Sequence, residues 1–126
     1  MKPLFKRRKR VLLLDDDPSM QRLVAHILGK DGFRVDVFLT GSQAIAALQK
    51  ATYDVLLLDL MMPHEGGMTV IRHLRGKNPP MLKRSILLTA SPDSLIEALS
   101  GEVSTVVQKP FEPKQLIDAV RLMSES

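Results

Sequence analysis

Short apolar runs alternate along the chain with segments whose apolar residues recur every three or four positions. Runs such as Val11–Leu14 and Val55–Leu58 have apolar residues at successive positions, as strands do when both faces of their sheet are covered. Charged or turn-forming residues bound each run. The pattern predicts five strands, near residues 11–14, 34–38, 55–58, 85–90 and 104–111.

The segments between these strands have the spacing of amphipathic helices. After the first strand, Met20, Leu23 and Val24 begin an apolar stripe; Asp17 is placed to cap this helix and Gly29 to end it. Further helices are expected from Thr40 or Ser42 onward, across Met68–Leu74 up to Gly76, Pro79 and Pro80, near Asp93–Leu99, and from Pro113 to Met123.

A regular alternation of strand and helix is typical of a parallel sheet. Crossover connections in such sheets are right-handed, which leaves few topologies. The 126 residues are too few for a closed barrel of eight strand–helix units. We expect a doubly wound α/β fold of the flavodoxin-like kind, with five parallel strands in the order 2-1-3-4-5 and helices on both faces.

The positive charge of the chain is concentrated at its N-terminus. Six of the 18 Lys and Arg residues lie in residues 1–10, which leaves twelve against all 14 Asp and Glu residues. We expect a basic tail at 1–10 and one globular domain at 11–124. The run KRRKR has the charge to contact nucleic acid or an anionic membrane, but it lacks interleaved aromatic residues. A solvated terminus without direct DNA binding is the expectation.

Two further features of the composition bear on the cellular compartment and on membrane insertion. The chain has no cysteine, which excludes disulfides and thiolate metal sites and favours a reducing compartment, so we expect a cytoplasmic protein. No apolar run approaches the length of a membrane span.

Polar residues follow four of the predicted strands at the point where each strand ends. Asp15 and Asp16 follow the first strand, Asp59 the third, Thr89 ends the fourth, and Lys109 ends the fifth. Because the carboxyl ends of parallel strands lie along one edge of the sheet, these residues are expected to meet in one ligand-binding crevice.

Several carboxylates in one crevice stay ionised only beside a cation. A set of oxygen ligands favours Mg²⁺, or Mn²⁺, which carboxylates bind together with water and phosphate oxygens. A carboxylate is also a competent nucleophile toward phosphorus. Asp59 stands alone at the end of a central strand, so we expect it to accept a phosphoryl group while Asp15 and Asp16 hold the metal.

The other polar residues have supporting roles in this interpretation. The ammonium group of Lys109 is expected to bind a phosphoryl oxygen, and Thr89 to offer a hydroxyl donor. Ala90 is small enough to leave the approach to the site open. Asp17 is assigned to the helix cap.

These residues resemble the receiver domain of two-component response regulators, the CheY-like family. The matching stretches are VLLLDDDPSM, YDVLLLDLMMP, SILLTA and QKPF, which together span Val11 to about Met123. The resemblance implies that a histidine kinase or a phosphotransfer protein phosphorylates Asp59. It also implies that the backbone carbonyl of Met61 completes the metal site, and that the domain is no enzyme beyond catalysing its own phosphorylation and dephosphorylation. It makes Lys109–Pro110 a candidate for a cis peptide bond.

The resemblance further implies a switch in which Thr89 moves toward the phosphoryl group. That movement repacks the face formed by the helix near Asp93–Leu99, the fifth strand and the last helix, a face that usually meets the partner and is a candidate dimer contact. Val106 stands where an aromatic switch residue is usual, the segment from Thr89 to Lys109 is about two residues short, and Gly66 replaces a usual acid. We therefore expect phosphorylation with an atypical conformational readout.

Two alternatives to a phosphorylated receiver remain open at this stage. One is a receiver fold that only docks onto a partner. The other is a phosphatase of the haloacid-dehalogenase type with Asp15 as nucleophile, although no cap domain fits in this length. No output domain follows Ser126, so the chain either acts alone on an output protein or belongs to a larger regulator with a C-terminal effector domain.

Overall fold

The computed structural model describes residues 8–62, 66–90 and 105–125. Its centre is a five-stranded sheet in the order β2-β1-β3-β4-β5, in which every neighbouring pair is parallel. The expected α/β fold and strand order are confirmed. The strands are β1 (Arg10–Leu14), β2 (Arg34–Phe38), β3 (Val55–Asp59), β4 (Ser85–Thr89) and β5 (Thr105–Gln108).

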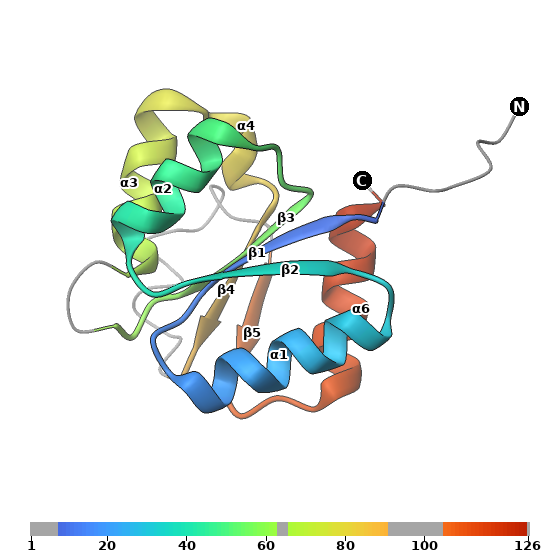
Figure 1. Cartoon of the computed structure of the whole chain (residues 1–126). Helices are drawn as coiled ribbons and strands as arrows, with labels where there is room; N and C mark the ends of the chain where they lie inside the picture. Colours follow the sequence, from blue (N-terminus) through green and yellow to red (C-terminus); the bar gives the residue numbers. More distant parts are fainter. Residues whose placement is uncertain (1–7, 63–65, 91–104, 126) are drawn as a thin grey trace, which may run out of the picture.

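Helices cover both faces of this sheet (Figure 1). One face carries α1 (Pro18–Lys30) and α6 (Pro113–Ser124), and the other carries α2 (Gly41–Lys50), α3 (Gly67–Lys77) and the short α4 (Pro79–Leu82). Among the described residues, no helix combines the length and the apolar character that crossing a membrane requires.

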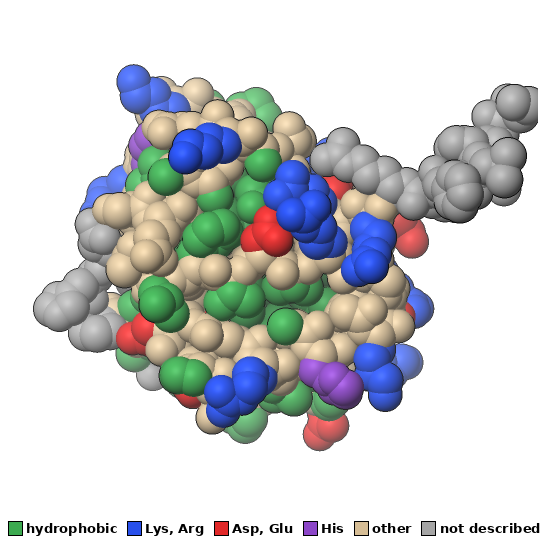
Figure 2. Space-filling model, viewed as in Figure 1, with side chains coloured by type: hydrophobic (Ala, Val, Ile, Leu, Met, Phe, Trp, Pro, Cys, Tyr) green, Lys and Arg blue, Asp and Glu red, His purple; other side chains and the backbone are tan. Residues whose placement is uncertain are grey.

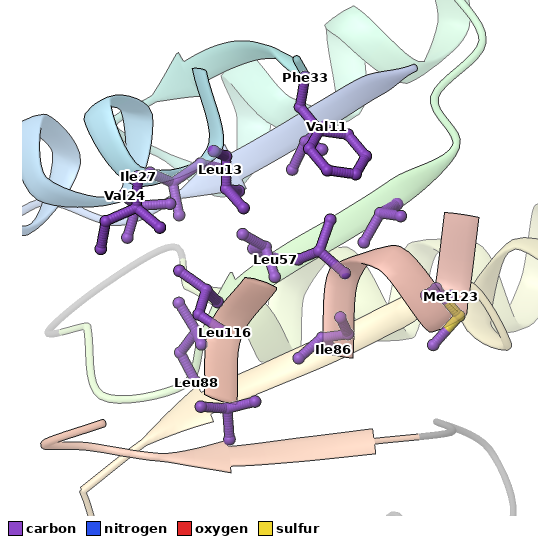
Figure 3. Packing of buried hydrophobic residues seen from close by; sticks show 14 residues of the cluster. Val11, Leu13, Val24, Ile27, Phe33, Leu57, Ile86, Leu88, Leu116 and Met123 are labelled. Carbon is purple, nitrogen blue, oxygen red and sulfur yellow. The ribbon is translucent and has the colours of Figure 1, made fainter. Parts of the chain in front are cut away.

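The sheet separates two hydrophobic cores because successive side chains of a strand point to opposite faces. On β1, Val11 and Leu13 face the core under α1 and α6, whereas Leu12 and Leu14 face the core under α2 and α3. Figure 3 shows the first of these cores, where side chains from the sheet meet Leu116 and Met123 of α6. These four side chains are fully buried, which explains why residues 11–14 form an undivided apolar run in the sequence.

Several boundaries differ from the sequence expectations. Strand β5 ends at Gln108, three residues before the expected end at residue 111, because the chain turns at Lys109 and Pro110. Helix α1 runs one residue past Gly29 to Lys30, and the left-handed backbone that follows belongs to Gly32, whose φ is 92°. Helix α3 continues through Gly76 to Lys77, and α4 begins at Pro79, where a loop was expected. Proline fits the first turn of a helix, because an N–H group there has no partner within the helix.

Arg10, the last residue of the expected basic tail, is the first residue of β1. Its guanidinium group lies 2.8 Å from the carboxylate of Asp36 and over the ring of Tyr53. The Tyr53 hydroxyl donates a 2.7 Å hydrogen bond to the same Asp36 carboxylate. These contacts join β1, β2 and the start of β3 at the end of the sheet where the strands begin. The expected helix near Asp93–Leu99 lies outside the described residues.

Candidate functional site

The register of the parallel strands brings the ends of the central strands level with one another. Leu14 pairs with Leu58 across β1 and β3, and Thr89 pairs with Gln108 across β4 and β5. The residues that follow these positions therefore meet along the carboxyl edge of the sheet, as the sequence predicts.

Three carboxylates form a cluster at this edge. Asp15, Asp16 and Asp59 each contribute one carboxylate oxygen to a group whose members all lie within 4.8 Å of one another. Asp15 and Asp59 are buried, with exposed fractions of 0% and 3%, whereas Asp16 is exposed. The cluster thus has a buried floor and one solvated carboxylate at its rim.

The ammonium group of Lys109 lies against this cluster. Its Nζ is 3.0 Å from Oδ2 of Asp15 and 3.6 Å from Oδ2 of Asp59. The backbone N–H of Lys109 donates to the carbonyl of Thr89 at 2.8 Å, which ties the end of β5 to the end of β4. The Lys109–Pro110 peptide bond is cis. Lys109 supplies a fixed positive charge to two buried carboxylates, which desolvation would otherwise penalise.

The Asp59 carboxylate is fixed by the chain that follows it. Its Oδ1 accepts a 2.9 Å hydrogen bond from the backbone N–H of Met61. Burial raises the pKa of Asp59 above its ordinary value, and this effect outweighs the hydrogen bond from Met61 and the charge of Lys109, both of which lower the pKa. Nearby Asp15 raises it further. A cation bound beside Asp59 would therefore stabilise its ionised carboxylate.

Side-chain hydrogen bonds hold the loop after β1 against the start of α1. Asp15 Oδ1 accepts one from the backbone N–H of Asp17 at 2.9 Å, and Asp17 caps α1 by accepting one from the N–H of Ser19 at 2.9 Å. The side-chain amide of Gln21 donates to the backbone carbonyl of Asp15 at 2.6 Å. Gln21 is not among the residues predicted from the sequence, because its contact is with a backbone carbonyl six residues earlier and depends on how α1 lies against its loop.

Thr89 and Ala90, the other predicted site residues, lie at the end of β4. Thr89 is fully buried at the end of β4, and Ala90 beside it is exposed. Val106 is partly buried on β5 and packs against the core under α2 and α3. Gly67 begins α3 against the β3 end of the site: a Cβ there would lie 2.9 Å from the backbone oxygen of Asp59. The structure thus gathers one carboxylate oxygen each of Asp15, Asp16 and Asp59 within 4.8 Å, with Lys109 against Asp15 and Asp59. Thr89 is joined to Lys109 through the backbone hydrogen bond between β4 and β5.

The side chains of the cluster fit a hard divalent cation. Carboxylate oxygens are the ligands that Mg²⁺ and Mn²⁺ prefer, and Mg²⁺ typically uses one or two carboxylates together with water. The exposed position of Asp16 leaves the cluster accessible from solvent.

Comparison with known proteins gives relatives over nearly the whole chain. Residues 11–121 match the family model described as the response regulator receiver domain. The chain is 37% identical over 116 residues to the DNA-binding response regulator MtrA of Mycolicibacterium smegmatis and 32% identical over 116 residues to the transcriptional regulatory protein ResD of Bacillus subtilis. Each alignment covers 90% of this chain but only 50% and 47% of the relative, so the chain spans about half the length of these proteins.

Solved structures agree with this relationship. The chemotaxis response regulator CheY4 of Vibrio cholerae aligns with a TM-score of 0.81 at 28% identity, covering 93% of this chain and 99% of that one. The receiver domain of the sensor histidine kinase PA1611 of Pseudomonas aeruginosa, crystallised with a magnesium ion in its active site cleft, aligns with a TM-score of 0.84. It is 24% identical, covers 95% of this chain and 100% of that one, and shows the shared fold. With the family match over residues 11–121, these relatives establish that the chain belongs to the response regulator receiver domain family of two-component systems.

Proposed function

We propose that residues 11–124 form a phospho-accepting receiver domain in which Asp59 takes a phosphoryl group from a sensor histidine kinase or a phosphotransfer protein. One observation carries the proposal: Asp59 is a buried carboxylate, oriented by the N–H of Met61 and placed beside Asp15, Asp16 and the ammonium group of Lys109. An orienting donor, a nearby cation and paired acids are the elements that phosphoryl transfer to a carboxylate requires.

In the proposed step, a carboxylate oxygen of Asp59 attacks phosphorus. An oxygen–phosphorus bond forms, the phosphorus–nitrogen bond of the donor phosphohistidine breaks, and the imidazole takes the bonding electrons. The Met61 N–H holds the attacking carboxylate in one orientation. Lys109, already 3.6 Å from Asp59, is the group assigned to bind the oxygens of the transferred phosphoryl group, and Thr89 to donate its hydroxyl to them.

Asp15, Asp16, Asp59 and the backbone carbonyl of Met61 are the groups that we assign to Mg²⁺ or Mn²⁺. When bound, such an ion supplies positive charge that offsets both the carboxylates and the phosphoryl oxygens. The three carboxylates support this assignment because their oxygens gather within 4.8 Å. The main chain of Met61 is adjacent to them through its hydrogen bond to Asp59.

The phosphatase alternative finds no support in this geometry. Both carboxylate oxygens of Asp15 are engaged, one by the N–H of Asp17 and the other by Lys109, and the residue is fully buried. Asp59 is the less tightly held of the two acids, because its Oδ2 lies 3.6 Å from Nζ of Lys109, against 3.0 Å for Oδ2 of Asp15.

Substitution of Asp59 tests the proposal directly. We expect wild-type protein to be labelled by acetyl phosphate in the presence of Mg²⁺ and the Asp59→Asn variant to lose the label, because an amide oxygen is a poor nucleophile and cannot carry the acyl phosphate. Asp118→Asn, which removes an exposed carboxylate on α6, is the matched control and should be labelled normally. Undiminished labelling of Asp59→Asn would remove the assignment. A wild-type protein that takes no label would instead favour a receiver fold used only for docking.

We further propose that the conformational readout is atypical, because Val106 has no ring to reorient when Thr89 moves. The shortened segment between Thr89 and Lys109 also motivates this proposal, although residues 91–104 lie outside the described part of the chain. Beryllofluoride, a stable mimic of the phosphoryl group, should shift amide resonances around Asp59 and Lys109 while leaving most of residues 91–107 little changed. A large response across Ser91–Val107 would contradict the proposal.

The partners follow from the family and remain proposals for this chain. Its curated relatives are DNA-binding or transcriptional regulators about twice its length. We propose an output through an effector domain or a separate output protein, a dimer contact on the face that includes β5 and α6, and a cytoplasmic location.

A further inference from the structure

Asp16 differs from the other two acids of the cluster in how its side chain is held. Asp15 and Asp59 are buried and lie against the ammonium group of Lys109. Asp16 is exposed, and no hydrogen bond or ion pair with another described residue fixes its carboxylate. The direction in which this carboxylate points therefore depends on the backbone on either side of it.

Both peptide groups that flank Asp16 are held by hydrogen bonds. The carbonyl of the preceding peptide group, that of Asp15, accepts a 2.6 Å hydrogen bond from the side-chain amide of Gln21. The N–H of the following peptide group, that of Asp17, donates to Oδ1 of Asp15 at 2.9 Å. Because each peptide group is planar, these two bonds restrict rotation of the backbone at Asp16.

Helix α1 carries Gln21 to this loop. Gln21 is the fourth residue of the helix, and helical side chains lean toward the N-terminus of their helix, which is where the loop lies. Its own N–H donates to the carbonyl of Asp17 at 2.9 Å, so the helix fixes its backbone. Asp and Glu side chains lie at the lower left of the surface in Figure 2, the edge at which β1 ends and α1 begins in Figure 1.

Helix capping does not account for the bond that Gln21 makes. Gln43 in α2 and Gln115 in α6 also contact the segments before their helices, but their side-chain oxygens accept from the backbone N–H groups of Leu39 and Glu112. Such bonds to N–H groups at the start of a helix are typical of capping. Gln21 instead donates to a carbonyl one residue past the end of β1, outside the helix. Its bond therefore fixes the metal-ligand loop rather than the helix start.

We propose that Gln21 is a positioning residue of the metal site, because its hydrogen bond to the Asp15 carbonyl sets the backbone from which Asp16 presents its carboxylate to the cation. The inference rests on the proposed function, which assigns Asp15 and Asp16 to Mg²⁺ or Mn²⁺. Groups that orient metal ligands without touching the ion change metal affinity by about 10- to 100-fold when they are removed. Gln21 bonds to the loop and not to Asp59 or Lys109, so it acts on metal affinity rather than on the phosphoryl acceptor.

Mn²⁺ binding tests this role without any phosphorylation. Gln21→Met keeps the length and net charge of the side chain and removes the donor. We expect the dissociation constant for Mn²⁺, measured from the electron paramagnetic resonance signal of the free ion, to rise about tenfold in this variant. An unchanged dissociation constant would overturn the proposal.

Gln43→Met is the matched control. It removes a comparable bond between a glutamine near the start of a helix and the segment before that helix, away from the acidic cluster. Both variants should unfold at a slightly lower urea concentration than wild type, since each loses one hydrogen bond. Gln43→Met should bind Mn²⁺ within about twofold of wild type, because positioning of metal ligands is local to the residues that orient them. Equal losses of affinity in the two variants would show that Gln21 acts through stability alone.

The amide N–H of Asp16 reports the loosening directly, because it belongs to the same peptide group as the Asp15 carbonyl. Its order parameter from ¹⁵N relaxation should be about 0.85 in wild type, the value of rigid backbone, and clearly lower in Gln21→Met. An equally rigid amide in the variant would contradict the proposed cause.

Labelling by acetyl phosphate separates metal binding from phosphoryl transfer. In Gln21→Met the Mg²⁺ concentration for half-maximal labelling rate should rise about tenfold, while the rate at saturating Mg²⁺ stays within about twofold of wild type. A rate that remains tenfold low at saturating Mg²⁺ would overturn the proposal, because Gln21 would then act on Asp59 or on the fold.

Failure of the proposed function gives a different result. Asp16→Asn that binds Mn²⁺ as tightly as wild type would contradict the metal assignment, and this inference would fail with it. Weaker Mn²⁺ binding in Asp16→Asn with wild-type affinity in Gln21→Met would overturn the inference alone. A wild-type protein that takes no label leaves the Mn²⁺ measurement valid, so the role of Gln21 is still decided.

Discussion

At the scale of single residues, the site depends on how buried charges compensate one another. Asp15 and Asp59 are almost fully buried, and Lys109 is the cation whose contacts with both are seen in the structure. The pKa of Asp59 is raised nevertheless, because loss of hydration outweighs the ammonium group and the Met61 hydrogen bond. Because the positive charge near Asp59 does not offset its lost hydration, a bound cation would stabilise the ionised carboxylate.

The second polar cluster, formed by Arg10, Asp36 and Tyr53, provides a test that one spectroscopic signal can follow. Tyr53 is the only tyrosine, and the chain has no tryptophan, so phenolate absorbance reports this residue alone. Burial, with the hydrogen bond to Asp36 and its negative charge, raises the pKa of Tyr53 to about 12. We expect the folded protein to titrate near that value and the urea-unfolded protein near the ordinary value of about 10.

The same shift fixes the sign of an alkaline effect on stability. Because the folded pKa is above the unfolded one, the contribution of neutral Tyr53 to the free energy of unfolding is complete below pH 10 and is lost as pH rises toward 12. In Asp36→Asn the tyrosine should titrate at a lower pH than in the wild type. A wild-type titration near 10 in the folded state would show that the contact with Asp36 is absent in solution.

At the scale of elements, the start of α3 is fitted closely against the end of β3. A Cβ on Gly67 would lie 2.9 Å from the backbone oxygen of Asp59 and from Cδ2 of Leu60, closer than side-chain carbons approach such atoms. The glycine therefore sets how near α3 can lie to the loop that orients the Asp59 carboxylate.

Gly67→Ala should accordingly lower the free energy of unfolding by about 1–3 kcal/mol, the usual cost of forcing extra atoms into a packed site. Gly76→Ala is the matched control, because a Cβ there meets no atom within 4 Å, and in the last turn of α3 it should stabilise by about 0.5–1 kcal/mol. Urea denaturation measures both changes. Equal stabilities of the two variants would show that α3 can shift away from β3 without cost.

The elements also show where sequence patterns are informative and where they are not. Undivided apolar runs predicted β1, β3 and β4 because both faces of the sheet are covered. The short α4 was not predicted, because prolines at residues 79 and 80 favour a loop in the sequence yet are compatible with a first helical turn. At the site, acids at strand ends were predictable from topology, whereas the contact of Gln21 with the Asp15 carbonyl depends on how α1 lies against its loop.

At the scale of the whole molecule, the fold places acidic side chains at one end of the sheet and basic side chains at the other. Residues 11–121 match the receiver family, and the strand ends gather the acidic cluster at one edge of the sheet. The strand starts and helix ends gather the basic residues at the other. A single parallel topology thus places the acidic cluster and these basic residues at opposite ends of the sheet.

The central claim is that Asp59, rather than any neighbouring acid, carries the phosphoryl group. Protein incubated with acetyl phosphate and Mg²⁺ can be reduced with borohydride, which converts an aspartyl phosphate to homoserine, and the modified residue then mapped by mass spectrometry. We predict homoserine at residue 59 alone, dependent on Mg²⁺. Modification at Asp15 or Asp16 with Asp59 intact would contradict the account.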